Sequence, residues 1–250
     1  MSTTDNFSEK IVLLIKEDKL DEAEKLWGEQ KPQYVYKFLP LGTSYESSMM
    51  QNLFLGKLHF NYVKNFDDKE ELNNNTFEFI SEFGKKIADK AKYKQKERNI
   101  FCCFSGSNAK TSEMWEKYAN NHNGIKCQFE VLSHENLLRV CYTDEKFKIK
   151  EVKNLDDGQN QINRNIFLHK YNPCMKEKKW NSQDEYRMIF GCEECFLPIL
   201  KAYCNDQNVL VNKNLKLTSI EIGNKVSEDN KLKIEKIAKD KNINCFIEEG

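Results

Sequence analysis

An acid and a base fall two positions apart in the segment Glu185-Tyr186-Arg187, and this spacing is the clearest indication of chemistry in the chain. In an extended strand, side chains alternate between two faces, so Glu185 and Arg187 share one face. Tyr186, Met188 and Phe190 share the opposite face, which we expect to be buried. The two charged side chains would then lie about 7 Å apart along the strand. Such a pair either grips a polar ligand or forms a structural ion pair, and both interpretations stay open.

The composition indicates a folded protein with no overall electrostatic preference. The 250 residues include 39 Lys+Arg and 39 Asp+Glu, so the formal net charge is zero and no global field attracts nucleic acid or acidic lipid. Charged residues make up 31% of the chain, yet 16 Phe, 10 Tyr and 3 Trp supply the large apolar side chains that a core needs. We therefore expect an ordered globular protein.

Neither end of the sequence resembles a targeting signal. Residues 1–10 are polar, and the apolar run at 11–15 is too short to span a bilayer. The nine cysteines are an odd number spread through strand-like segments, which is typical of small buried hydrophobes in a reducing compartment. These features predict a cytoplasmic protein with no membrane association.

Hydrophobic periodicity predicts an α+β fold with a mixed, mostly antiparallel central sheet and flanking helices. Apolar residues at helical spacing predict an N-terminal helical pair that ends at Lys31-Pro32. We therefore expect a helical appendage at 1–31 and a single α+β domain at 32–250. Strands are predicted at 34–39, 57–62, 99–105, 125–131, 138–143, 146–152, 185–190, 195–200, 217–223 and 243–247. Helices are predicted at 44–54, 76–95, 158–171 and 227–240, and from a cap at Thr111 or Ser112 to a stop at Asn123-Gly124.

Several familiar chemistries lack their motifs. The chain has no phosphate-binding P-loop, no Gly-x-Gly-x-x-Gly turn, no Gly-x-Ser-x-Gly elbow and no His-Glu-x-x-His. Cys192 and Cys195 have the spacing of a metal or redox pair, but no second such pair accompanies them. We therefore predict no metal site.

Two motifs are specific enough to indicate a family. The first is Met114-Trp115-x-x-Tyr118-Ala119-x-x-His122-x-Gly124, and the second is Trp180 followed by Glu185-Tyr186-Arg187. With Lys57-Leu58-His59-Phe60 and Ile220-Glu221-Ile222-Gly223, they resemble the bacterial family catalogued as domain of unknown function 2971, over residues 34–248. The chain departs from that family at Phe66-Asp67-Asp68-Lys69, where the family usually has Phe-Asn-Asp-Pro.

The order of three strand segments is also similar to that of ADP-ribosyltransferases. An early strand carries Tyr36-Lys37, a middle strand ends in Ser105, and a late strand begins with Glu185. The similarity implies NAD as substrate, with Glu185 stabilising the positive charge that develops on the ribose when nicotinamide leaves. Lys37 or Arg187 would contact the ribose or phosphates, and Ser105 and Tyr36 would support the site. The similarity further implies a toxin or antiphage effector that modifies a nucleic-acid or protein acceptor.

These residues should meet if they serve one ligand. We expect one cleft to contain Lys37, Ser105, Trp115, Tyr118, Glu185 and Arg187. In this scheme Glu185 and Ser105 are catalytic. NAD contacts come from Tyr36, Lys37, Trp115, Tyr118 and Arg187.

Two other classes of function stay open. A non-catalytic ligand-binding or sensor module, in a defence or toxin–antitoxin system, would use Trp115, Tyr118 and Trp180 as the lining of a pocket. A Mg²⁺-dependent nuclease would use the clustered carboxylates at 67–71. The N-terminal helical pair would either bind a partner protein or cover a sheet edge.

Overall fold

The computed structural model describes residues 3–41, 53–62, 77–79, 99–149, 167–168, 170–191, 209–211 and 213–248. Within these ranges an eight-stranded sheet forms the centre of the molecule, with the strand order β14-β13-β6-β1-β5-β11-β7 and with β3 paired to β5 off this path. Neighbouring strands are antiparallel except β13 and β14, which are parallel. The strands are β1 (Tyr34–Pro40), β3 (Asn61–Tyr62), β5 (Asn99–Ser105), β6 (Gly124–Val131), β7 (Leu137–Arg139), β11 (Glu185–Gly191), β13 (Leu215–Ile222) and β14 (Asn244–Ile247).

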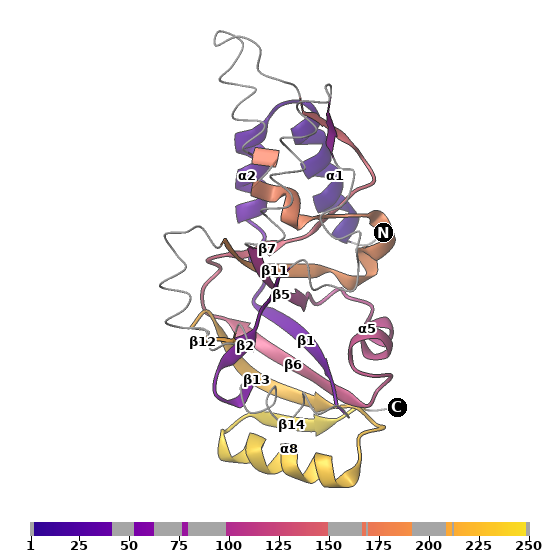
Figure 1. Ribbon diagram of the computed structural model, residues 1–250, viewed down its shortest axis with the longest axis vertical. Coiled ribbons are helices and arrows are strands. Elements are labelled where there is room, and N and C mark those ends of the chain that lie inside the picture. Colours follow the sequence, from indigo (N-terminus) through magenta and orange to yellow (C-terminus); the bar gives the residue numbers. More distant parts are fainter. Residues whose placement is uncertain are drawn as a thin grey trace.

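Helices lie at both ends of this sheet. α1 (Thr3–Lys16) and α2 (Leu20–Gly28) lie at the end near β7 and β11, and α8 (Glu228–Asp240) lies at the opposite end beside β14 (Figure 1). α5 (Thr111–Tyr118) lies alongside β1 and β6. Short pairs of strands complete the described fold: β2 (Lys57–His59) with β12 (Val209–Val211), β4 (Phe77–Phe79) with β9 (Phe147–Ile149), and β8 (Cys141–Tyr142) with β10 (Met175–Lys176). Two 3-10 turns, η2 (Asn172–Cys174) and η3 (Lys178–Gln183), flank β10.

Alternating side chains explain how the sheet separates its faces. Along β6, Ile125, Cys127 and Phe129 are buried, while Lys126 and Gln128 are only partly covered. The buried side chains join the main core, which runs along the sheet and includes Val35, Phe104, Met188 and, from α8, Ile234. This core follows from the period of two that a half-buried strand imposes.

A second core joins the helical pair to the rest of the chain. Phe7, Ile11 and Ile15 of α1 and Ala23 and Trp27 of α2 are buried in it. On the other side it contains Cys141, Phe147, Phe167, Leu168, Tyr171, Cys174 and Met175. The Trp27 ring stacks on Tyr171 with 4.4 Å between ring centroids, so residues 1–31 share a core with the larger region.

The structure confirms the α+β class, the mostly antiparallel central sheet and the N-terminal helical pair. Around Glu185 the strand phase is confirmed for Tyr186 and Met188, which are buried, whereas the side chain of Phe190 lies outside the described residues. The opposite face, with Glu185 and Arg187, is buried as well, because η2 and β10 cover it.

Other boundaries differ from the prediction. The helix predicted over 76–95 is wrong at its start, because the alternating Phe-Glu-Phe at 77–79 forms β4. Neither Thr111 nor Ser112 caps α5, which begins after Lys110 with no side-chain cap. That helix ends at Tyr118, since residues 120–122 turn with φ values of 47, 53 and 68°. The predicted strand at 195–200 lies outside the described residues.

No helix in the described ranges is both long enough and apolar enough to cross a membrane.

Candidate functional site

The central sheet opens between β1 and β5. β1 pairs with β6 along its full length, from Tyr34 to Pro40, but with β5 at one position only, where Tyr36 lies opposite Ser105. β5 in turn pairs with β11 from Ser105 to Asn99. Beyond the pair Tyr36 and Ser105, β1 therefore remains paired with β6 and β5 with β11, while β1 and β5 separate from each other.

A cavity of about 490 Å³ occupies this split, within the range of about 300–1,000 Å³ that small-molecule sites have. Five consecutive residues of β1 and five of β5 line it, at 36–40 and 101–105. Successive side chains of a strand point to opposite faces of the sheet. Five consecutive residues of one strand can therefore border the same cavity only if that cavity lies along the edge of the strand. The other lining residues come from several elements and are His59, Met114, Tyr118, Lys176, Gln183 and Glu185.

Glu185 is the carboxylate of this cavity. It begins β11 directly opposite Ser105, which lies opposite Tyr36, so these three side chains form a row across three strands. Glu185 is 5% exposed and accepts hydrogen bonds from two cations: Arg187 Nε at 2.7 Å and Lys176 Nζ at 2.9 Å. The carboxylate is thus held on both oxygens.

The two cations keep Glu185 ionised. Burial alone would raise the pKa of Glu185, but the charges of Arg187 and Lys176, with their hydrogen bonds, hold it well below its ordinary value. A carboxylate with so low a pKa is a poor proton acceptor at neutral pH. Glu185 is therefore a fixed anion of the cavity wall and not a base.

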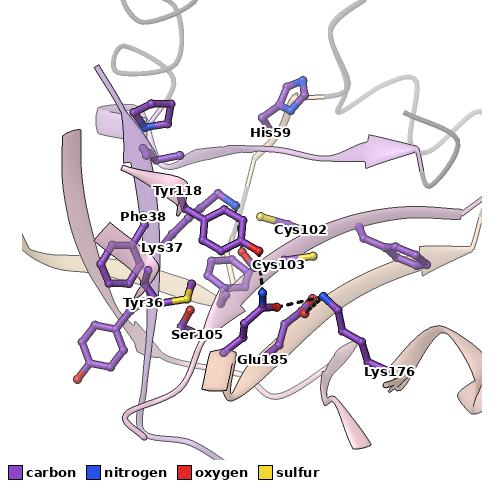
Figure 2. Close-up of a pocket in the computed structure, with 16 residues that line it drawn as sticks. Tyr36, Lys37, Phe38, His59, Cys102, Cys103, Ser105, Tyr118, Lys176 and Glu185 are labelled. Carbon is purple, nitrogen blue, oxygen red and sulfur yellow. Dashed lines mark hydrogen bonds and ion pairs between the residues drawn. The ribbon is translucent and has the colours of Figure 1, made fainter. Parts of the chain in front are cut away.

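A chain of polar contacts links Glu185 to the surface. Lys176 Nζ also donates to Gln183 Oε1 at 3.0 Å, and Gln183 Nε2 donates to the Tyr118 hydroxyl at 2.9 Å. Figure 2 shows the Lys176 ammonium directed at Glu185 and the Tyr118 hydroxyl joined to the same chain of contacts. Tyr118 is 41% exposed, so the chain runs from a surface ring to a buried carboxylate.

Lys37 brings a second cation to the cavity wall. Its Nζ donates to the carbonyl oxygen of Cys103 at 3.0 Å and lies 5.3 Å from the centre of the Phe104 ring (Figure 2). Among the residues that the structure describes, no carboxylate is within ion-pair distance of Lys37. Within the described lining, Lys37 therefore adds a positive charge that Glu185 does not neutralise, and this charge favours an anionic group on a ligand.

His59 faces the same cavity. Burial, aided by the positive charge of Lys37, lowers the pKa of His59 below its ordinary value, so the imidazole is neutral at physiological pH. A neutral imidazole can accept a hydrogen bond from a ligand or donate one to it, and it adds no charge to the cavity.

The structure brings together most of the site residues that the sequence predicted. Tyr36, Lys37, Ser105, Tyr118 and Glu185 all line the cavity.

Trp115 and Arg187 are not among the lining residues. Trp115 is 1% exposed in a small core with Phe38 and Met114, and its ring meets Phe38 edge-on at 5.3 Å. Arg187 is also 1% exposed; it lies behind Glu185 and donates to the Pro173 carbonyl at 2.6 Å. Trp115 therefore packs against the lining residue Phe38, and Arg187 holds the lining residue Glu185, without reaching the cavity themselves.

Sequence reasoning missed Lys176, Gln183 and His59 as site residues. Lys176 lies in a two-residue strand and Gln183 ends a 3-10 turn, and neither element has a periodicity that could have predicted it. His59 belongs to a strand that the sequence predicted, but nothing in the sequence indicated that it would line the same cavity as Lys37.

The nuclease hypothesis and a metal or redox pair at Cys192 and Cys195 would both need ligands for an ion. The described residues contain no cluster of His, Cys, Asp or Glu that could hold one. The carboxylates at 67–71 and the pair Cys192 and Cys195 lie outside those residues. The nuclease reading therefore stays a prediction.

Comparisons with known proteins identify no relative: no protein-family model, no curated protein and no solved structure matches this chain. The resemblance to domain of unknown function 2971 and the similarity to ADP-ribosyltransferases accordingly stay predictions from motifs.

Proposed function

We propose that the cavity between β1 and β5 binds NAD and that the protein cleaves its nicotinamide–ribose bond, transferring ADP-ribose to a nucleic-acid or protein acceptor. The observation that carries this proposal is one cavity bordered by an ionised, buried carboxylate, Glu185, and by a cation without a carboxylate partner in the described chain, Lys37. In this proposal the protein acts in the cytoplasm as a toxin or antiphage effector.

The chemistry assigns different tasks to the two charges. When the bond breaks, its electron pair leaves with nicotinamide and the ribose gains oxocarbenium character. Glu185, fixed by Arg187 and Lys176, stabilises that positive charge without having to reorganise. The acceptor, or water, then bonds to the ribose carbon and loses its proton to solvent, because the low pKa of Glu185 makes it a poor base.

The other lining residues bind and orient the substrate. Lys37 would contact the pyrophosphate, where its charge offsets that of the ligand. Ser105 lies opposite Glu185 on the neighbouring strand and would contact the ribose, and Tyr36, opposite Ser105, would support the site from β1. Tyr118, exposed at the cavity, offers a ring for stacking.

A second function is favoured by one specific observation. Both oxygens of Glu185 already accept hydrogen bonds from buried cations, as in many structural ion pairs. A non-catalytic sensor that binds NAD or a related nucleotide would need only Lys37, His59 and the aromatic lining. The two functions differ in whether bound NAD is consumed.

The test measures binding and turnover separately. Purified protein is titrated with NAD by calorimetry, and free nicotinamide is quantified by chromatography, with and without single-stranded nucleic acid or protein as acceptor. We expect Lys37→Met to weaken NAD binding and Glu185→Gln to lower nicotinamide release by about 10²–10³-fold with binding retained.

A matched control is available elsewhere in the sheet. Glu221 of β13 pairs with Lys126 of β6 at 2.9 Å, and neither lines the cavity, so Glu221→Gln should leave binding and turnover unchanged. NAD binding without nicotinamide release would favour the sensor. Absence of both would refute the proposal, and activity lost to EDTA and restored by Mg²⁺ would favour the nuclease.

A further inference from the structure

The residue before Glu185 has an unusual backbone conformation. Asp184 lies in the left-handed region, with φ 41° and ψ 56°, and is 2% exposed. Residues other than glycine rarely adopt this conformation unless surrounding contacts impose it. Because Asp184 is adjacent to Glu185, whatever holds Asp184 also sets the direction in which the Glu185 side chain leaves the strand.

Asp184 accepts three hydrogen bonds, which hold it in place. Its Oδ1 accepts a hydrogen bond from Arg139 NH2 at 3.0 Å, and its Oδ2 accepts one from the backbone N–H of Asn108 at 3.1 Å. Its carbonyl oxygen accepts a hydrogen bond from the backbone N–H of Gly106 at 2.6 Å. Of these partners, Arg139 is the one that reaches the N-terminal helices.

Arg139 is bound to α2 and its C-terminal end. Its NH1 donates to Gln30 Oε1 at 2.8 Å, and its carbonyl oxygen accepts a hydrogen bond from Trp27 Nε1 at 2.8 Å. The guanidinium carbon also lies 5.0 Å from the centre of the Phe7 ring in α1. The residue that fixes Asp184 is therefore itself fixed by both helices.

A second, independent connection reaches Glu185 itself. The backbone N–H of Glu185 donates to the Tyr142 hydroxyl at 2.8 Å, and the backbone N–H of Tyr142 donates to Ser8 Oγ of α1 at 2.9 Å. Asp184, the residue before β11, and Glu185, its first residue, are thus each linked to the helical pair through one intermediate residue.

We propose that the N-terminal helical pair is a positioning element for the Glu185 carboxylate, acting through Arg139 on Asp184 and through Tyr142 on the Glu185 backbone. No described residue of the two helices lines the cavity, so their effect is on the geometry of the carboxylate and not on substrate contact. The consequence for turnover rests on the proposed function, whereas the consequence for the carboxylate geometry does not.

The variants remove the connections and leave the shared core intact. Gln30→Leu removes the acceptor from Arg139, and Ser8→Ala removes the acceptor from Tyr142. Gln30→Glu keeps an acceptor on Arg139 and should rescue the first effect. The control is Glu24→Gln, because Glu24 of α2 joins the helical pair to Lys170 and Tyr171 and not to β11.

The first measurement does not depend on whether the protein releases nicotinamide. The ¹³C chemical shift of the Glu185 carboxyl carbon, assigned with Glu185→Gln, should change in the Gln30→Leu/Ser8→Ala double variant and stay unchanged in Glu24→Gln. The second readout is kinetic: kcat for nicotinamide release should fall on the order of 10-fold to 100-fold with little change in KM, as expected for a misplaced catalytic group.

The outcomes separate the two proposals. An unchanged carboxyl shift in the double variant would overturn the positioning role, even if the melting temperature fell, because the helices would then only add stability. A changed shift in a protein that releases no nicotinamide would support the positioning role and count against the transferase. A shift that changes equally in Glu24→Gln would also overturn it.

Discussion

Glu185→Gln should destabilise the fold as well as slow turnover, because it removes the only anion from a buried triad. The side chains of Glu185, Arg187 and Lys176 are 7%, 1% and 9% exposed, so both cations would lose their contact with the carboxylate at a position where little water can replace it. Breaking a buried ion pair from one side typically costs about 3–5 kcal/mol. We therefore expect a fall of that size in the free energy of unfolding.

The assay is urea unfolding at pH 7, followed by tryptophan fluorescence, for the wild type and three variants. Lys176→Met alone leaves Glu185 with one cation, and Glu185→Gln/Lys176→Met removes one charge of each sign. The double variant should be more stable than the sum of the two single effects predicts, with a coupling of about 1–3 kcal/mol.

Glu221→Gln serves as the matched control. Its ion pair with Lys126 is more exposed, at 17% and 22%, so its loss should cost less than about 1 kcal/mol. If Glu185→Gln cost no more than this control, the carboxylate would not be an ionised partner of two buried cations. The electrostatic role proposed for it in catalysis would then lose its basis.

Three further predictions use other features of the site. Because the pKa of Glu185 is lowered in the folded state, its stabilisation is fully present above the unfolded pKa of about 4.3 and is lost progressively as pH falls from there through the much lower folded pKa; the free energies of unfolding of wild type and Glu185→Gln, measured in urea, should therefore approach each other step by step below about pH 4.3. His59 is neutral partly because of Lys37, so an anionic ligand should raise the pKa of His59 and bind more tightly as pH falls from about 7 to 5.5, a dependence that His59→Asn should abolish in calorimetry. Gly106→Ala should cost about 1–3 kcal/mol in urea unfolding, since its Cβ would lie 2.3 Å from Asp184 Oδ2; an unchanged midpoint would contradict the close approach.

The sequence predicted the elements whose patterns are local. The alternation in Ile125, Cys127 and Phe129 and the phase of Tyr186 and Met188 required no knowledge of distant residues, because a strand imposes its period on each face. The same phase placed Glu185 and Arg187 together, and they do form an ion pair.

What the sequence could not predict depends on long-range pairing. The cavity exists because β1 meets β5 at one position, and nothing within either segment shows where a strand will leave its neighbour. Lys176 reaches Glu185 from a short strand whose position depends on pairing with β8. Trp115 was expected in the cleft because it lies beside Tyr118 on a helix, yet a large apolar ring there packs inward onto Phe38.

The single meeting point of β1 and β5 has a consequence for cooperativity. One part of the sheet consists of β1 with β6, β13 and β14, and the other of β5 with β11 and β7. Long runs of paired residues join the strands within each part, whereas β1 and β5 pair at one position only. The two parts are therefore candidates for separate units of local opening, with different amide exchange rates. A ligand bound in the split would contact both parts, so the two parts would open together and not separately. Saturation with ligand should therefore make the thermal unfolding transition steeper and raise its midpoint temperature.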